Sequence, residues 1–149
     1  MRVLFVCTGN TCRSPMAEAI LKEIAEERNL EIEVQSAGVY AADGQIASRN
    51  AIKAVDTKEI KEHRSQRLTK ELMKWADLVL VMTGSHLDII NELYPEAKHK
   101  THLFLDYTEY KEQDIADPFG GSIEEYELVK RQLEEAVFGL LEKINEEEI

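Results

Sequence analysis

Cysteine is scarce in this sequence: Cys7 and Cys12 are the only two among 149 residues. Two cysteines are too few for the disulfide framework of a small secreted domain, so in a reducing compartment they are either packed or reactive. Long apolar runs are missing as well, and none approaches the roughly 18–20 residues that a transmembrane helix needs. The first expected strand begins directly after Met1, which leaves no room for a signal peptide. We therefore predict a cytoplasmic protein that does not bind membranes.

Basic residues are in the minority. Lysine and arginine total 18 against 29 acidic residues, a formal net charge of −11. This balance argues against a nucleic-acid partner, which requires a basic face. Any phosphate site must then be local, built from backbone N–H groups and one or two arginines. Metal motifs are also lacking, because no cysteine pair at metal-ligand spacing flanks a histidine, and we predict neither a metal nor a cofactor. The four histidines are His63, His86, His99 and His102.

Apolar periodicity predicts an α/β fold. Short β-branched or alternating segments indicate strands at 2–6, 31–36, 77–82 and 102–105. Helical spacing follows Ser14 and Pro15, the expected N-cap and first helical residue, and returns at 46–56, 69–76, 85–93 and from about 122. The alternation predicts three layers, with helices on both faces of a parallel sheet. No linker or repeat interrupts it, so we predict a single domain over residues 1–149, and a monomer.

The loop between the first strand and the first helix, Cys7 to Arg13, carries the most chemistry. In an open parallel sheet, ligands bind beyond the carboxyl ends of the strands, where this loop lies. Its N–H groups and the helix N-terminus are expected to surround an oxyanion, to which Arg13 adds a bidentate pair. We expect Gly9 to let the backbone turn inward, and Asn10 to brace the turn or adopt a left-handed conformation. The positive electrostatic field of these N–H groups, the helix N-terminus and Arg13 also favours the thiolate form of Cys7. The thiolate would be a nucleophile placed beneath a bound phosphate.

Ordinary packing is the alternative for this loop. A cysteine after an apolar strand is commonly a core residue, and Cys-x5-Arg alone is a short motif. The site interpretation needs a preceding strand, an internal glycine and a Ser-Pro helix start to coincide, and all three are present. We therefore favour an anion-binding loop with a nucleophilic cysteine.

The segment CTGNTCRSPMAEA, Cys7 to Ala19, resembles the signature of the low-molecular-weight protein tyrosine phosphatases. The likeness extends over essentially the whole chain, including Ser36-Ala-Gly after the second strand. It implies a four-stranded parallel sheet with a phosphate-binding loop after the first strand, and makes Cys7 the nucleophile. It also implies that Ser14 holds the thiolate ionised and that Ser36 and His63 brace Asn10. The phosphate-binding residues that it implies are Thr8, Gly9, Asn10, Thr11, Cys12 and Arg13.

Asp117, in the loop DIADPFGGS, is the expected acid. Expulsion of a leaving group from phosphorus is faster when a positioned side chain protonates it. Asp117-Pro118 matches the Asp-Pro acid of the phosphatases that this chain resembles, which would donate its proton first and then activate water. The alternative is an Asp-Pro turn without a catalytic role. Because the chain also contains an anion-binding loop, we favour the interpretation of Asp117 as a catalytic acid.

Two residues depart from the tyrosine-specific pattern and resemble the bacterial protein-arginine phosphatases of this family. Thr11 stands where tyrosine-specific members carry a bulky aliphatic residue, and Phe119 is followed by two glycines rather than a second aromatic. A phosphoarginine presents several N–H donors, which the Thr11 hydroxyl and the Asp117 carboxylate can accept, while Phe119 flanks the alkyl stem. We therefore predict a protein-arginine phosphatase that acts on phosphorylated proteins through a phosphocysteine. The alternative is that Thr11 is a small residue that does not affect the choice of substrate.

Cys12 has two possible roles. It can form a disulfide with an oxidised Cys7 and so protect it from irreversible over-oxidation, or it can be a small packing residue. Other functions also remain open for the chain as a whole. A tyrosine phosphatase on the same scaffold is the first alternative, and a phosphocysteine carrier domain is the second. The carrier needs neither Arg13 nor Asp117, and an arsenate reductase needs a further cysteine that this chain lacks.

Overall fold

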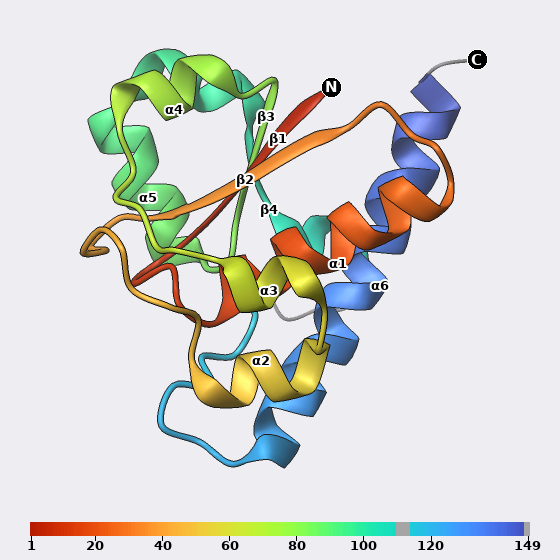
Figure 1. Cartoon of the computed structure of the whole chain (residues 1–149). Helices are drawn as coiled ribbons and strands as arrows, with labels where there is room; N and C mark the ends of the chain where they lie inside the picture. The colour runs from red at the N-terminus through yellow and green to blue at the C-terminus, as the bar shows by residue number, and fades with distance from the viewer. Residues whose placement is uncertain (110–113, 148–149) are drawn as a thin grey trace.

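Four parallel strands form a single sheet, in the order β2-β1-β3-β4, in the computed structural model, which describes residues 1–109 and 114–147. Figure 1 shows α4 and α5 on one side of this sheet and α1 and α6 on the other, as the predicted three-layer α/β fold requires. The described elements are β1 (Arg2–Cys7), α1 (Arg13–Glu27), β2 (Glu33–Gly38), α2 (Arg49–Val55), α3 (Lys58–Glu62), α4 (Lys70–Trp75), β3 (Leu78–Val81), α5 (Gly84–Leu93), η1 (Pro95–Lys100), β4 (Thr101–Leu103), η2 (Phe104–Tyr107) and α6 (Ile123–Glu147).

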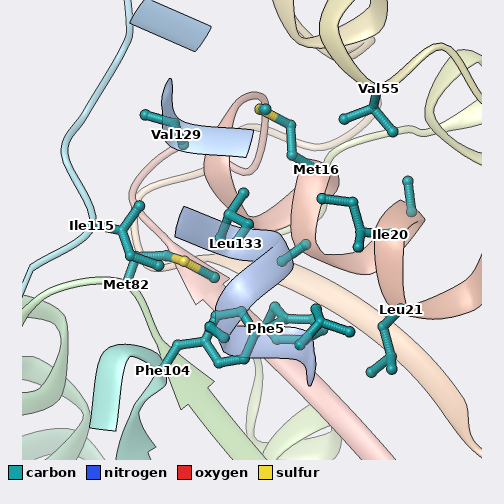
Figure 2. Packing of buried hydrophobic residues seen from close by; sticks show 14 of the residues in the cluster. Phe5, Met16, Ile20, Leu21, Val55, Met82, Phe104, Ile115, Val129 and Leu133 are labelled. Atoms are coloured by element: carbon teal, nitrogen blue, oxygen red, sulfur yellow. The ribbon is translucent and has the colours of Figure 1, made fainter. Parts of the chain in front are cut away.

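Strand β1 is covered on both faces, which explains its continuous apolar sequence. Because successive side chains point to opposite faces, Phe5 packs into the core shared with α1, α2 and α6, and Leu4 into the core shared with α4 and α5. Figure 2 shows the first of these cores, where Phe5 lies beside Phe104 with ring centroids 4.9 Å apart, and Leu133 of α6 packs nearby. In the part of the chain that the structure describes, none of the helices combines the length and the apolar character that a membrane span requires.

The start of α1 differs from the prediction. The helix begins at Arg13, and Cys12 occupies the N-cap position without a capping side chain, so Ser14 is not the N-cap. The hydroxyl of Ser14 is engaged instead with the sulfur of Cys7 and the amide of Asn10. Pro15 is the third helical residue rather than the first. It is tolerated there because the first four N–H groups of a helix have no partner within the helix.

Other boundaries shifted because long-range pairing decides where a strand lies. β2 extends to Gly38 because it pairs with the full length of β1, from Arg2 opposite Glu33 to Cys7 opposite Gly38. The helix predicted at 46–56 is shorter (α2), the strand predicted at 102–105 ends where η2 begins, and α3 is absent from the prediction. The helix predicted at 69–76 is confirmed as α4, and it is capped by Thr69, whose side chain accepts from the Leu72 N–H.

The strand order places the loop after β1 at the centre of the sheet edge. The chain leaves β1 toward β2 on one side and leaves β3 toward β4 on the other, so the direction of winding reverses between β1 and β3. In open α/β sheets, ligands bind in the crevice at this reversal point, outside the carboxyl ends of the strands. Cys7 ends β1 at this crevice, and Met82 follows the end of β3 beside it.

Candidate active site

The loop from β1 to α1 turns its carbonyl groups outward. The Thr8 carbonyl accepts from the Tyr40 N–H at 3.0 Å, and the Thr11 carbonyl accepts from the Ser48 N–H at 2.8 Å. In a trans peptide the next N–H points away from the carbonyl, so the N–H groups that follow these residues face the inside of the loop. Together with the first N–H groups of α1, they form a concave site for an anion.

Asn10 shapes this loop from behind. It is fully buried and has a φ of 57°, the left-handed conformation expected for it. Its side-chain amide donates to Ser14 Oγ at 2.9 Å and to Ser36 Oγ at 2.8 Å, and its Oδ1 accepts from the Gln66 N–H at 2.9 Å. His63 Nε2 donates to the Asn10 carbonyl at 2.7 Å. Asn10 therefore braces the loop, as predicted, but it does not line the pocket.

Glu18 extends the brace and was missed by the sequence analysis. Ser36 Oγ donates to Glu18 Oε1, and the same oxygen lies 3.9 Å from His63 Nδ1. Lys22, one turn further along α1, pairs with the other carboxylate oxygen. Because Ser36 donates to Glu18, its oxygen is available as an acceptor for Asn10. The spacing of Glu18 and Lys22 was the one signal in the sequence, and it is common to many solvated helices.

Gly38, at the end of β2, lets the loop approach the sheet. A Cβ atom at this position would lie 2.5 Å from the Thr8 carbonyl oxygen and 2.9 Å from the Asn10 nitrogen. Gly9 does not have this role, because a Cβ there would make only an ordinary contact, 3.8 Å from Thr11 Oγ1, and its φ is not positive. The tight part of the turn is thus at Asn10, and the close approach is at Gly38 rather than at Gly9 as expected.

Cys7 lies at the base of the loop, 3% exposed, with its sulfur 2.8 Å from Ser14 Oγ. Since the Asn10 amide donates to the same Ser14 oxygen, the hydroxyl hydrogen of Ser14 is free to point at the sulfur. A hydrogen bond donated to sulfur stabilises its anionic form. The relay from Asn10 through Ser14 to Cys7 therefore supports the thiolate that the sequence analysis expected.

Arg13 and Asp117 meet across the crevice. Arg13 is 4% exposed; its Nη1 donates to the Ile115 carbonyl at 3.0 Å, and its Nη2 lies 3.7 Å from Asp117 Oδ2. Ile115 is fully buried and its N–H donates to the Met82 carbonyl at 2.8 Å, beside the core shown in Figure 2. Ile115 thus anchors the loop two residues before Asp117, whose side chain is 56% exposed.

These residues surround a cavity of about 400 Å³. It brings together the predicted nucleophile, arginine and acid with Thr11 and Phe119. Tyr40 and Gln45, from the segment after β2, also line it and were missed; their only signal was their position beyond the carboxyl end of a strand. The lining residues are Cys7, Thr8, Gly9, Thr11, Cys12, Arg13, Tyr40, Ala41, Ala42, Gln45, Asp117 and Phe119.

Cys12 faces a small polar cluster as well as the cavity. Its sulfur lies 3.3 Å from the Tyr126 hydroxyl and 3.5 Å from Ser48 Oγ. Burial, reinforced by the hydrogen bond with Cys12, raises the pKa of Tyr126 to about 12. Cys7 and Cys12 are both free cysteines in this structure, with no disulfide between them. Among the described residues, no group of three or more histidine, cysteine or acidic side chains is placed to hold a metal ion.

His86 is a site residue that the sequence analysis missed. It is 4% exposed, and its Nε2 lies 2.8 Å from the hydroxyl of Thr8 in the anion-binding loop. Burial, and secondarily the charge of Arg13, lower the pKa of His86 to about 4, although Asp114 and Asp117 act in the opposite direction. Its imidazole is therefore neutral at pH 7. The other unassigned histidines, His99 and His102, are exposed.

The model of a protein family described as low molecular weight phosphotyrosine protein phosphatase matches residues 2–149 of this chain. The chain belongs to this family. A protein-arginine-phosphatase of Geobacillus stearothermophilus is 48% identical over 149 residues, covering 99% of this chain and 98% of the relative. One of Bacillus subtilis is 43% identical over 148 residues, covering 99% of each.

A solved structure of a phosphatase C7S mutant resembles the chain closely. The molecule is described as the YwlE arginine phosphatase with a phosphorylated active site serine, and it superposes with a TM-score of 0.90 at 43% identity, over 97% of this chain and 96% of that one. In that phosphatase, the phosphoryl group is therefore on the active-site side chain. The phosphatase family and its fold, inferred above from the Cys7–Ala19 signature, are confirmed for this chain.

Proposed function

We propose that this member of the phosphatase family hydrolyses phosphoarginine on proteins through a phosphocysteine intermediate. The observation that carries the proposal is the single cavity in which the sulfur of Cys7, the guanidinium of Arg13 and the carboxylate of Asp117 converge, with Thr11 and Phe119 in its wall. The two relatives that are named protein-arginine-phosphatases, at 48% and 43% identity, support arginine as the phosphorylated residue.

In the first step, the Cys7 thiolate attacks phosphorus while the loop N–H groups and Arg13 hold the phosphoryl oxygens. The S–P bond forms as the P–N bond to the substrate breaks, and the electron pair of that bond stays on the guanidino nitrogen. Asp117 gives this nitrogen its proton, so that the arginine side chain departs as its ordinary guanidinium rather than with an unprotonated nitrogen. The exposed position of Asp117 at the rim suits an acid that must reach a leaving group outside the anion-binding loop.

In the second step, Asp117 is a carboxylate and acts as the base. It takes a proton from a water molecule whose oxygen attacks phosphorus, and the S–P bond breaks with its electron pair returning to Cys7. Inorganic phosphate leaves, and both residues regain their starting protonation states. The hydroxyl of Ser14, 2.8 Å from the sulfur, stabilises the returning thiolate and so helps this step.

Thr11 and Phe119 support phosphoarginine over phosphotyrosine. The guanidino N–H groups of the substrate need acceptors once the cavity excludes water. The Thr11 hydroxyl and the side-chain carbonyl oxygen of Asp117, which remains an acceptor while the acid is protonated, both border the cavity. An unsatisfied buried donor costs about 1–3 kcal/mol, or about one to two orders of magnitude in preference. Phe119 is 75% exposed and can cover the alkyl stem of the arginine when a substrate binds.

A tyrosine phosphatase is the second candidate function. The exposed aromatic rings of Tyr40 and Phe119 both line the cavity and can stack on a phenyl ring, and the family description names phosphotyrosine. A phosphocysteine carrier domain is less compatible with the site, because the Asp117 carboxylate beside the cavity would activate water and promote hydrolysis of the intermediate that a carrier must preserve. A cytoplasmic location and a monomeric state remain predictions of the sequence.

Two synthetic peptides of the same sequence, one carrying phosphoarginine and the other phosphotyrosine, test the proposal. We expect phosphate release to be faster, by kcat/KM, from the phosphoarginine peptide, and abolished for both by Cys7→Ser. The Asp117→Asn variant should lose about 10²–10⁴-fold in kcat, because it lacks the proton for the leaving group. Faster release from phosphotyrosine would favour the second candidate. A wild-type phosphocysteine that persists in water and passes to another protein would favour a carrier.

A further inference from the structure

The anion-binding loop is tied to a histidine from the other side of the crevice. Thr8, the residue directly after Cys7, lines the cavity, and its Oγ1 lies 2.8 Å from His86 Nε2. The two residues are 78 positions apart and meet because β1 and β3 are neighbours in the sheet. Nothing in the two-step reaction above uses this contact.

The backbone around His86 fixes where its ring lies. His86 is the third residue of α5, and its N–H donates to the side chain of Thr83, the N-cap, at 3.2 Å. Two residues before it, the Gly84 N–H donates to Asp114 Oδ1 at 2.7 Å. The start of α5 is thereby held against both the end of β3 and the loop that carries Asp117. The His86 ring is therefore held more rigidly on this helix end than it would be on a surface loop.

The hydrogen-bonding state of the ring can be worked out from its surroundings. The imidazole is neutral at pH 7, because burial and the charge of Arg13 lower the pKa of His86 to about 4. A neutral imidazole carries one N–H donor and one acceptor. Its Nδ1 is buried and has no hydrogen-bond partner among the described residues. A buried N–H without a partner is rarer than a buried acceptor without one, so the hydrogen belongs on Nε2.

We propose that His86 is a positioning residue that donates its Nε2 hydrogen to Thr8 and thereby directs the Thr8 hydroxyl hydrogen at a phosphoryl oxygen in the cavity. The hydroxyl of Thr8 has one hydrogen. If that hydrogen were given to His86, a phosphate would face the lone pairs of the hydroxyl and be repelled. With His86 as the donor, the hydroxyl becomes one more charge-assisted donor to the anion. This inference rests on the proposed phosphatase function of the same site.

The matched pair His86→Gln and His86→Asn tests the proposal. The amide nitrogen of glutamine can occupy the place of Nε2 and still donate to Thr8, whereas asparagine is shorter and cannot reach it. Both variants keep a polar side chain of moderate size, and thermal unfolding checks that both are folded. We expect His86→Asn to weaken the binding of inorganic phosphate by up to about tenfold, because the Thr8 hydroxyl is no longer held with its hydrogen toward the anion, and His86→Gln to restore most of the affinity.

A double-mutant cycle with Thr8→Val shows whether the effect passes through Thr8. Thr8→Val should weaken phosphate binding to a similar degree, Thr8→Ser should not, and adding His86→Asn to Thr8→Val should cause no further loss. A full additional loss in the double variant, or unchanged phosphate affinity in folded His86→Asn, would overturn the proposal. Because phosphate binding is measured by calorimetry without turnover, this outcome is distinct from failure of the proposed function, which the phosphopeptide assay reports.

Discussion

Replacement of Asn10 gives the sharpest test of how the anion-binding loop is held. The residue combines a left-handed backbone, with φ of 57°, and three side-chain hydrogen bonds, to Ser14, Ser36 and the Gln66 N–H. Asn10→Gly removes the side chain but tolerates the backbone conformation. Asn10→Ala removes the side chain and adds the left-handed strain. Asn10→Asp keeps the shape but turns the donor toward Ser14 and Ser36 into an acceptor.

The expected magnitudes follow from these contacts. A hydrogen bond contributes about 0.5–1.5 kcal/mol net, so losing three lowers the free energy of unfolding by about 1.5–4.5 kcal/mol in Asn10→Gly. Alanine adds about 1–2 kcal/mol for a left-handed φ, partly offset because glycine loses about 0.5–1 kcal/mol more backbone entropy on folding. We therefore expect Asn10→Ala to be about 1 kcal/mol less stable than Asn10→Gly.

Urea unfolding at pH 7 measures these differences, and turnover of para-nitrophenyl phosphate shows their effect on the site. Asn10→Asp should be the least active of the folded variants. Its carboxylate cannot donate to Ser14, so the relay to the Cys7 sulfur is lost, and it places a negative charge near the thiolate. The reasoning is refuted if Asn10→Gly unfolds at the same urea concentration as the wild type, or if Asn10→Ala is the more stable of the pair.

Three further predictions concern other parts of the site. Thr11→Ile should raise the ratio of kcat/KM for phosphotyrosine over phosphoarginine peptides by about tenfold or more, because it removes an acceptor for guanidino N–H groups. An unchanged ratio would mean that Thr11 has no effect on substrate preference. Peroxide should inactivate the wild type reversibly and Cys12→Ser irreversibly, as measured by activity after thiol treatment, and full recovery of the variant would exclude a protective disulfide. Burial lowers the pKa of His86 from its ordinary 6.5 to about 4, so the unfolded chain binds the proton first. The wild type should therefore lose stability as the pH falls from 6.5 to about 4. His86→Gln, compared by urea unfolding at pH 7 and pH 4.5, should lose less, and an equal loss would contradict the assignment.

Local patterns predicted the parts of the fold that depend on near neighbours. The helices α4 and α6 lie where helical spacing was predicted, at 69–76 and from about 122. The Thr69 cap of α4 and the apolar stripe of α6 (Tyr126, Val129, Leu133) involve residues at most four positions apart, which a short window of sequence contains. The anion-binding loop was recognised for the same reason: Cys7, Asn10 and Arg13 lie within seven consecutive residues. The start of α1 was misplaced because the hydroxyl of Ser14 is used by Cys7 and Asn10 rather than as a cap.

Long-range contacts decided the rest. The sequence by itself determined a three-layer α/β domain with a cysteine and an arginine around an anion, through strand and helix periods and one compact motif. Only the tertiary structure decided that Glu18 orients Ser36 and His63, that Gly38 admits the loop, and that His86 reaches Thr8. Each of these contacts joins residues 18 to 78 positions apart or depends on the closeness of two backbones. Such proximity follows from strand order and register, which no short window of the chain contains.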